Sequence, residues 1–178
     1  MSRKRTRRER YQAKLPEAKK YPISLCAVNF RADENLGYLI RAAACFGANR
    51  VYVIGHVPER NDLKASSGSL IDYVEIKQFS TPSAFIRHAE NENIQVVAAE
   101  LVQGARSLSD YTFNFDRDIC LVVGNEEIGV PIEILSIAET VYIPMPGVGY
   151  CLNTAQTANI LLYETVHRYE ERRVVNYV

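Results

Sequence analysis

Apolar and polar positions alternate between two kinds of segment along most of the chain. Short runs rich in Val, Ile, Leu and Ala, typical of buried strands, are separated by longer segments whose apolar residues recur at helical spacing. The sequence predicts strands at 23–28, 50–54, 74–79, 94–99, 119–123 and 141–143. It predicts helices at 36–46, 82–92, 131–138 and 152–172. Strands and helices that alternate at this spacing indicate an α/β fold, with a mostly parallel sheet and helices on both faces.

The chain contains no internal repeat and no linker that would separate two domains. Its 178 residues are enough for one domain with a substantial core. The first twenty residues differ from the rest because they lack apolar periodicity and are densely charged. We therefore expect residues 1–20 to form a flexible basic arm and residues 21–178 to form a single domain.

The arm carries most of the positive charge of a chain whose formal net charge is zero. Nine basic and two acidic residues give the first twenty positions a net charge of +7, and the remainder carries −7. Dense Arg and Lys favour contact with phosphates, so RNA is the partner that we predict. A solvated tail, or a helix that ends near Pro16, is the alternative interpretation. The predicted RNA-binding residues are Arg3, Lys4, Arg5, Arg7, Arg8 and Arg10.

Several functional classes lack support in the sequence. No apolar run approaches the roughly 18 residues that a membrane helix needs, and the N-terminus has no secretory apolar segment. The four cysteines contain no Cys-x-x-Cys pair, and the three histidines show no metal-ligand spacing. We therefore expect a cytoplasmic protein with reduced cysteines, no metal and no membrane contact.

The usual nucleotide-binding and hydrolase motifs are also absent. The sequence contains no Gly-x-Gly-x-x-Gly after its first strand, no Gly-x-x-x-x-Gly-Lys-Ser/Thr and no Gly-x-Ser-x-Gly. Polar residues follow three of the predicted strands instead, at the sheet edge where ligands bind in open α/β folds. The first of these segments places Asn35 ahead of a helix, as a cap residue, and Arg41 inside it. Arg41 is interpreted equally well as a phosphate or carboxylate ligand and as a salt bridge to a neighbouring helix.

The other two segments are loops that contain glycine and proline. Gly124–Pro131 follows one apolar run, and Pro144–Asn153 follows another. Glycines let a ligand approach the backbone closely, and prolines stop the preceding strand. Either loop alone is more often a structural turn than a binding site.

Together the three segments resemble the SpoU (TrmH-like) class of the SPOUT superfamily of RNA methyltransferases. Asn35 and Arg41 match that family's first motif, and Leu121–Gly129 matches its Gly-Asn-Glu-x-x-Gly motif. The third motif is matched by Ile143, Pro144, Met145, Gly147, Leu152 and Asn153, and Lys64–Gly68 resembles a short Ser/Gly segment of the family. The resemblance extends over about residues 23–172.

The resemblance implies a deep trefoil knot in the C-terminal part, a homodimer, and S-adenosylmethionine as the methyl donor. The implied reaction is methylation of a ribose 2′-hydroxyl in tRNA or rRNA, in a site that the partner subunit completes. The implied catalytic residues are Arg41, Asn35, Glu126 and Asn153. The implied cofactor-binding residues are Gly124, Asn125, Gly129, Ile143, Met145, Gly147, Cys151, Leu152 and Asn153.

Arg41 is the proposed base in that family, but a guanidinium resists deprotonation because its pKa exceeds about 12. Arg41 could instead hold the phosphate next to the reacting ribose, with Glu126 orienting it or facing substrate. The chain departs from the family pattern at Cys151, where Ser is usual, and at Thr154–Thr157. These departures leave open a second function, that of a non-catalytic RNA-binding or assembly protein that retains the fold.

Overall fold

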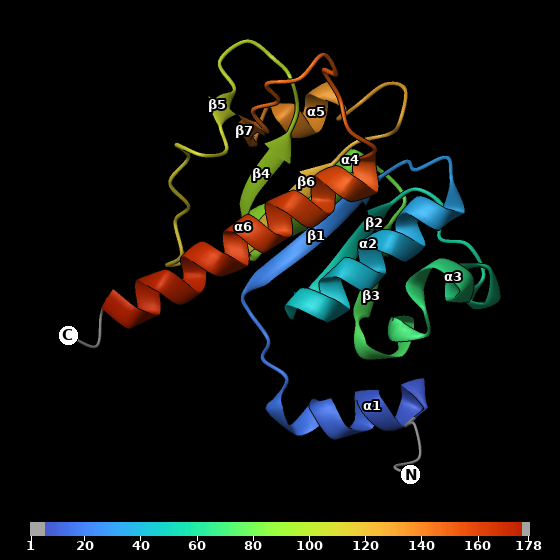
Figure 1. Ribbon diagram of the computed structural model, residues 1–178. Coiled ribbons are helices and arrows are strands. Elements are labelled where there is room, and N and C mark those ends of the chain that lie inside the picture. The colour runs from blue at the N-terminus through green and yellow to red at the C-terminus, as the bar shows by residue number, and fades with distance from the viewer. Residues whose placement is uncertain (1–5, 176–178) are drawn as a thin grey trace.

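The computed structural model describes residues 6–175 and has a seven-stranded parallel sheet at its centre (Figure 1). The strand order is β3-β2-β1-β6-β4-β7-β5, and every pair of neighbours is parallel. The strands are β1 Ile23–Val28, β2 Arg50–Ile54, β3 Glu75–Phe79, β4 Gln95–Ala99, β5 Arg106–Ser107, β6 Ile119–Val123 and β7 Glu139–Tyr142. The helices are α1 Arg7–Lys14, α2 Asp33–Phe46, α3 Arg60–Ser67, α4 Pro82–Asn91, α5 Ile132–Leu135 and α6 Thr154–Val175, with 3-10 turns at Leu15–Glu17 and Leu70–Tyr73.

Helices cover both faces of the sheet, as the sequence predicted. In β1, Leu25 and Ala27 face one core cluster, whereas Cys26 and Val28 face the other, because successive side chains point to opposite faces of a strand. Helices α2 and α6 pack side by side on the first face (Figure 1), and α4 and α5 pack on the second. The central strands β1 and β6 are buried throughout, which explains why β6 is a continuous apolar run and β1 is interrupted only by Ser24.

Helix α2 contacts α3 at very short range. A Cβ added at Gly37 would overlap the hydroxyl of Ser66 on α3, so the two backbones can approach only because residue 37 has no side chain. Helix α2 ends at Gly47, which has a φ of 73° and donates its backbone N–H to the carbonyl of Ala43. This glycine is the helix stop that the sequence predicted.

The predicted strands and helices are all present; β1, β2 and β6 match at both ends, and the ends of the others differ by at most three residues. Helix α2 begins at Asp33 rather than Leu36, so the expectation that Asn35 caps the helix is wrong. Asn35 lies in the first turn instead, where Asp33 and Glu34 favour the helix start by complementing its dipole. Helix α6 begins at Thr154 rather than residue 152.

The predictions did not include α3, the short strand β5 or the two 3-10 turns, and a helix at α1 was only the alternative interpretation. Helix α1 lies within the basic arm and starts with a capping box between Thr6 and Glu9, which corresponds to the helical alternative for this segment. Its aromatic residue Tyr11 packs edge-on against Tyr73 and donates its hydroxyl to the carbonyl of Gly68, 3.3 Å away. Residues 1–5 lie outside the described part of the chain, and with them Arg3, Lys4 and Arg5.

Candidate functional site

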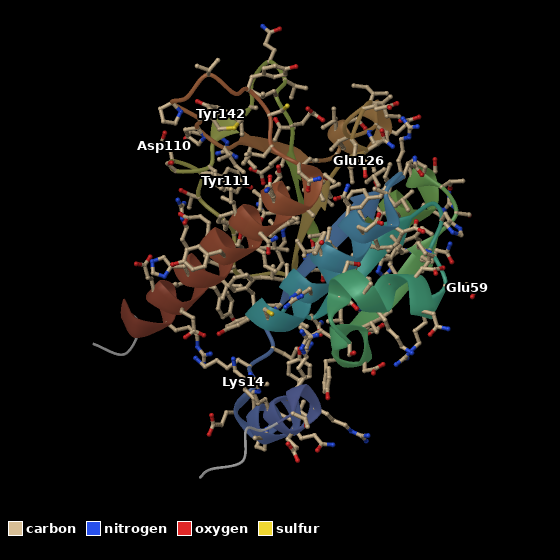
Figure 2. The ribbon with its side chains drawn as sticks, turned by 45° about the vertical axis from the view of Figure 1, so that its right-hand side comes forward. Lys14, Glu59, Asp110, Tyr111, Glu126 and Tyr142 are labelled. Carbon is tan, nitrogen blue, oxygen red and sulfur yellow. The ribbon has the colours of Figure 1, made fainter. Side chains whose placement is uncertain are left out.

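The loops that follow β1, β6 and β7 meet at the carboxyl edge of the sheet. Strands β1 and β6 pair in parallel, with Ala27 opposite Val123, so their ends coincide. The loop after β7 reaches the same edge and leads into α6. Figure 2 shows Glu126 and Tyr142 at this end of the molecule, and Lys14 of α1 at the opposite end. The topology therefore gathers the three segments singled out in the sequence.

A chain of hydrogen bonds joins Asn153, Asn35 and Glu126, one residue from each segment. The Nδ2 of Asn153 donates to Oδ1 of Asn35 at 3.0 Å, and the Nδ2 of Asn35 donates to Oε1 of Glu126 at 2.6 Å. Asn35 is 7% exposed, although it is polar, and this pairing satisfies its amide. Three of the four residues predicted to be catalytic therefore lie in direct contact with one another.

Glu126 also accepts hydrogen bonds from the loop that precedes α2. The backbone N–H of Arg31 donates to Oε2 at 2.9 Å, and that of Ala32 donates to Oε1 at 3.2 Å. Burial disfavours the charged carboxylate, but the hydrogen bonds from Arg31 and Asn35 outweigh it and lower the pKa of Glu126. Glu126 is therefore an anion at neutral pH that holds the first and second segments together.

Asn153 also forms hydrogen bonds with the first backbone N–H groups of α6. Its Oδ1 accepts hydrogen bonds from the backbone N–H groups of Ala155, at 2.9 Å, and Gln156, at 3.3 Å. This is the geometry of a helix N-cap. A single side chain thus fixes the helix end and the position of Asn35.

The loop after β6 is a tight turn held by Asn125. Its Oδ1 accepts hydrogen bonds from the backbone of Glu127 and Ile128, while its Nδ2 donates to the carbonyl of Asn29. Gly129 has a φ of +69°, and a Cβ at Gly124 would overlap the backbone of Gly129. Both glycines of the motif are therefore required by the turn itself.

A cavity of about 660 Å³ opens between the second and third loops. Its walls include most residues predicted to bind the cofactor: Gly124, Asn125, Gly129, Ile143, Met145, Cys151, Leu152 and Asn153. Gly147 is not part of the wall. The walls also contain Glu100, Leu101, Tyr142 and Tyr150, which sequence reasoning missed. Glu100 directly follows β4 at the same sheet edge, and that position was a usable signal.

The cavity fits the nucleoside methyl donor that the sequence resemblance implies. Its volume lies within the roughly 300–1,000 Å³ of typical small-molecule sites. Ala99, Leu101, Val123 and Ile143 give it apolar walls suited to a purine, and the glycines leave backbone groups accessible. Among the described residues, no cluster of three or more side chains could hold a metal ion, and no helix is long and apolar enough to cross a membrane.

Arg41 lies apart from the other predicted catalytic residues. It is six residues after Asn35 on α2, which corresponds to about 9 Å along a helix axis. Its guanidinium lies beside Gly68, with Nη1 3.3 Å from the position that a Cβ of residue 68 would occupy. No described carboxylate forms an ion pair with this exposed side chain, so Glu126 does not orient Arg41 in the single chain. The alternative of a helix-to-helix salt bridge is likewise not found among these residues.

The basic residues of the two terminal helices differ in their contacts. Arg7, Arg8 and Arg10 lie exposed on α1, as RNA-binding side chains would. In contrast, Arg168 on α6 pairs with Glu164 and donates to backbone carbonyls, and Arg172 pairs with Asp116. Arg168 and Arg172 are thus engaged by groups of the chain itself.

Comparison with known proteins agrees with these motifs. Residues 22–163 match the SpoU rRNA Methylase family. The chain is 23% identical over 143 residues to the tRNA (guanosine(18)-2′-O)-methyltransferase of Escherichia coli K12, covering 80% of this chain and 62% of that enzyme. It is 27% identical over 160 residues to the enzyme of the same name from Aquifex aeolicus, covering 88% and 74%.

Among solved structures, the Aquifex aeolicus TrmH/SpoU tRNA-modifying enzyme superposes with a TM-score of 0.77 at 24% identity, over 92% of this chain and 85% of that one. This likeness establishes the fold. The chain spans less than two thirds of the Escherichia coli enzyme, so the activity of that whole protein does not transfer automatically.

Proposed function

Since the chain belongs to the SpoU rRNA Methylase family, we propose that it transfers a methyl group from S-adenosylmethionine to a ribose 2′-hydroxyl of tRNA or rRNA. The observation that carries this proposal is the hydrogen-bonded chain of Asn153, Asn35 and Glu126 at the mouth of the donor-sized cavity. The three family motifs are far apart in sequence, and a shared network beside one cavity is the arrangement that a common reaction requires. The relatives' names supply the class of reaction and of substrate.

The residues that would hold the donor are those of the second and third loops that line the cavity. S-adenosylmethionine supplies a methyl group on a sulfonium, which is already activated for transfer. The protein therefore has to align the ribose hydroxyl with the methyl group and stabilise its surroundings. Asn35, Glu126 and Asn153 hold the two loops and the start of α2 in the required arrangement.

We assign to Arg41 the phosphate next to the reacting ribose. A guanidinium stays charged at any pH that the protein tolerates, and its planar fork suits a phosphate. Arg41 has no described carboxylate to neutralise it and lies about 9 Å beyond Asn35 along α2. It is therefore available to substrate rather than to the donor.

The test is Arg41→Ala, compared with Arg60→Ala as a control, because Arg60 is also exposed but pairs with Asp72. We expect Arg41→Ala to abolish incorporation of labelled methyl into RNA while S-adenosylhomocysteine binds within about threefold of wild type by calorimetry. Normal turnover by this variant would remove Arg41 from the mechanism. Wild-type protein that binds no S-adenosylhomocysteine would favour a non-catalytic RNA-binding protein.

We also propose that α1 contacts RNA on the side of Arg41. It lies at the opposite end of the molecule from the cavity (Figure 2), and Tyr11 attaches it to Gly68, which Arg41 also approaches. Replacing Arg7 and Arg8 by Gln should lower the slope of log affinity against log salt by up to about 2, since each phosphate contact contributes roughly 0.7–0.9. Arg172→Gln is the control, because Arg172 pairs with Asp116. An unchanged slope would show that Arg7 and Arg8 do not contact phosphates of the RNA.

A homodimer is part of the same proposal. The outer side of α6 exposes Ile160 and Tyr163, and the loop before it exposes Val148 and Tyr150. Large apolar side chains on one helix face support burial against a second copy. Light scattering coupled to gel filtration should give twice the chain mass, and Tyr163→Glu should lower it.

The trefoil knot, the single domain and the cytoplasmic location belong to the same proposal. A trefoil knot is supported by the path of the chain after β7, which crosses the carboxyl ends of β4 and β6 and then packs as α6 against α2 and β6. The hydroxyl of Thr154 donates to the carbonyl of Gly124 on the way, at 2.9 Å. Residues 21–178 would form one domain. The four cysteines are free in the structure, which supports a cytoplasmic location.

A further inference from the structure

A carboxylate with spare hydrogen-bonding capacity lies in the wall of the cavity. Glu100 directly follows β4, and its Oε2 accepts a hydrogen bond from the backbone of Val130 at 2.9 Å. Its Oε1 accepts another from the backbone of Leu101 at 3.0 Å. Gly129 makes room for this arrangement, because a Cβ there would overlap Oε2 of Glu100. The side chain is thus fixed between β4 and the second loop.

Glu100 differs from the other two carboxylates that line the cavity. Glu126 accepts three hydrogen bonds from Arg31, Ala32 and Asn35, and Glu127 forms an ion pair with Arg31. Glu100 accepts two and has no cationic partner among the described residues, whereas an ionised carboxylate can accept about four hydrogen bonds. Two acceptor positions remain for a ligand.

The sheet order places Glu100 away from the reacting end of the site. Strand β6 lies between β1 and β4. The network of Asn35, Glu126 and Asn153 lies on the β1 side of the loop after β6, and Glu100 lies on the β4 side. A donor that fills the cavity with its methyl group toward that network would present its nucleoside, not its sulfonium, to Glu100.

We propose that Glu100 accepts hydrogen bonds from the 2′- and 3′-hydroxyls of the donor's ribose and thereby selects a ribonucleoside donor. This inference rests on the proposed function. A vicinal diol offers two O–H donors to the two oxygens of one carboxylate, and acidic side chains recognise ribose hydroxyls in other nucleotide sites for this reason. The flat adenine is better accommodated by the apolar walls at Val123 and Ile143.

The test measures calorimetric affinities of S-adenosylhomocysteine and of its 2′-deoxy and 3′-deoxy analogues. The wild type should bind the parent ligand about 10- to 100-fold more tightly than either analogue, the range expected for one hydrogen bond to a charged group. Glu100→Gln and Glu100→Ala should bind all three ligands within about threefold of one another. Glu133→Gln changes an exposed carboxylate on α5 and should preserve the wild-type ratio.

A purely structural role for Glu100 predicts a different pattern. Loss of its contacts to Leu101 and Val130 would weaken the binding of all three ligands equally and leave the affinity ratio between parent ligand and deoxy analogues unchanged. That result, or a wild-type ratio near one, would overturn the inference while leaving the donor site intact. If neither variant folds by circular dichroism, Glu100→Asp keeps the charge on a shorter side chain and should still reduce the ratio. Wild-type protein that binds none of the ligands would overturn the proposed function and this inference together.

Discussion

The hydrogen bond between Asn35 and Glu126 can be tested by a double-mutant cycle. Asn35→Ala removes the donor, Glu126→Ala removes the acceptor, and the double variant removes both. If the bond is present in solution, the two single variants should share part of their destabilisation, because each of them breaks the same interaction.

The structure sets the expected size of the effect. A hydrogen bond to a charged group contributes roughly 1.5–3 kcal/mol when buried. Glu126 is exposed, so solvent screening reduces the coupling free energy to about 1 kcal/mol. Asn35→Ala also leaves the Nδ2 of Asn153 without its partner, which adds about 1 kcal/mol. We therefore expect Asn35→Ala to lower the free energy of unfolding by about 2 kcal/mol at pH 7.

The coupling should depend on pH, with a sign that follows from the pKa of Glu126. Its pKa is lower in the folded protein than in the unfolded chain, where carboxylates of Glu titrate near about 4.3. The stabilisation is therefore present above this value and is lost as the pH falls through the folded-state pKa. At pH 3 the stability difference between wild type and Glu126→Ala should be smaller than at pH 7.

Urea unfolding of the four proteins at pH 7 and pH 3, followed by circular dichroism, measures all of these quantities. Glu133→Ala serves as the control and should show no coupling to Asn35→Ala, because it lies on α5 outside the network. If the stability losses of Asn35→Ala and Glu126→Ala at pH 7 add up to the loss of the double variant within about 0.3 kcal/mol, the bond is refuted. If the stability difference between wild type and Glu126→Ala does not change with pH, the idea that the ionised carboxylate of Glu126 makes the bond is refuted.

Two further predictions concern the cavity and the core. S-adenosylhomocysteine should protect Cys151, which lines the cavity, from alkylation by N-ethylmaleimide and should leave Cys45, which is also exposed, reactive. Mass spectrometry of labelled peptides measures both reactions, and a Cys151 that the ligand does not protect would show that the donor binds elsewhere. Gly37→Ala should lower the free energy of unfolding by about 1–3 kcal/mol, since its methyl group would overlap Ser66. Adding Ser66→Gly to the same chain should restore part of the loss. Wild-type stability of Gly37→Ala in urea would show that α2 and α3 do not pack so closely.

Much of the fold could be predicted because its signals are local. Strand β6 is a continuous apolar run and β1 is interrupted only by Ser24, and Gly47 stops α2 by adopting a left-handed conformation that other residues avoid. Helix α1 was only the alternative interpretation of the arm because net charge dominated that interpretation, although Thr6 and Glu9 form a capping box that the sequence displays. The two-residue strand β5 has no signal of its own and exists through pairing with β7.

The site was predictable only as far as its residues carry a recognisable motif. The resemblance brought Asn35, Glu126 and Asn153 into one hypothesis, but only the three-dimensional path of the chain shows that they bond in series. Asn35 was placed outside its helix because Asn is a common N-cap, whereas its amide is used by Glu126. Glu100 belongs to no motif; its position after a predicted strand was the available signal, and its place in the cavity wall is seen only in the structure.

The four residues predicted to be catalytic differ in how much a substitution can reveal about function. Asn153 caps α6 and holds Asn35, and Glu126 ties the loop before α2 to the loop after β6. Loss of activity in variants of these residues would therefore be explained equally well by loss of structure. Arg41 differs from these three, because its exposed guanidinium has no carboxylate partner among the described residues. Removing an exposed, unpaired arginine that lies apart from this network should change stability little, so a loss of activity in Arg41→Ala would not be explained by loss of structure.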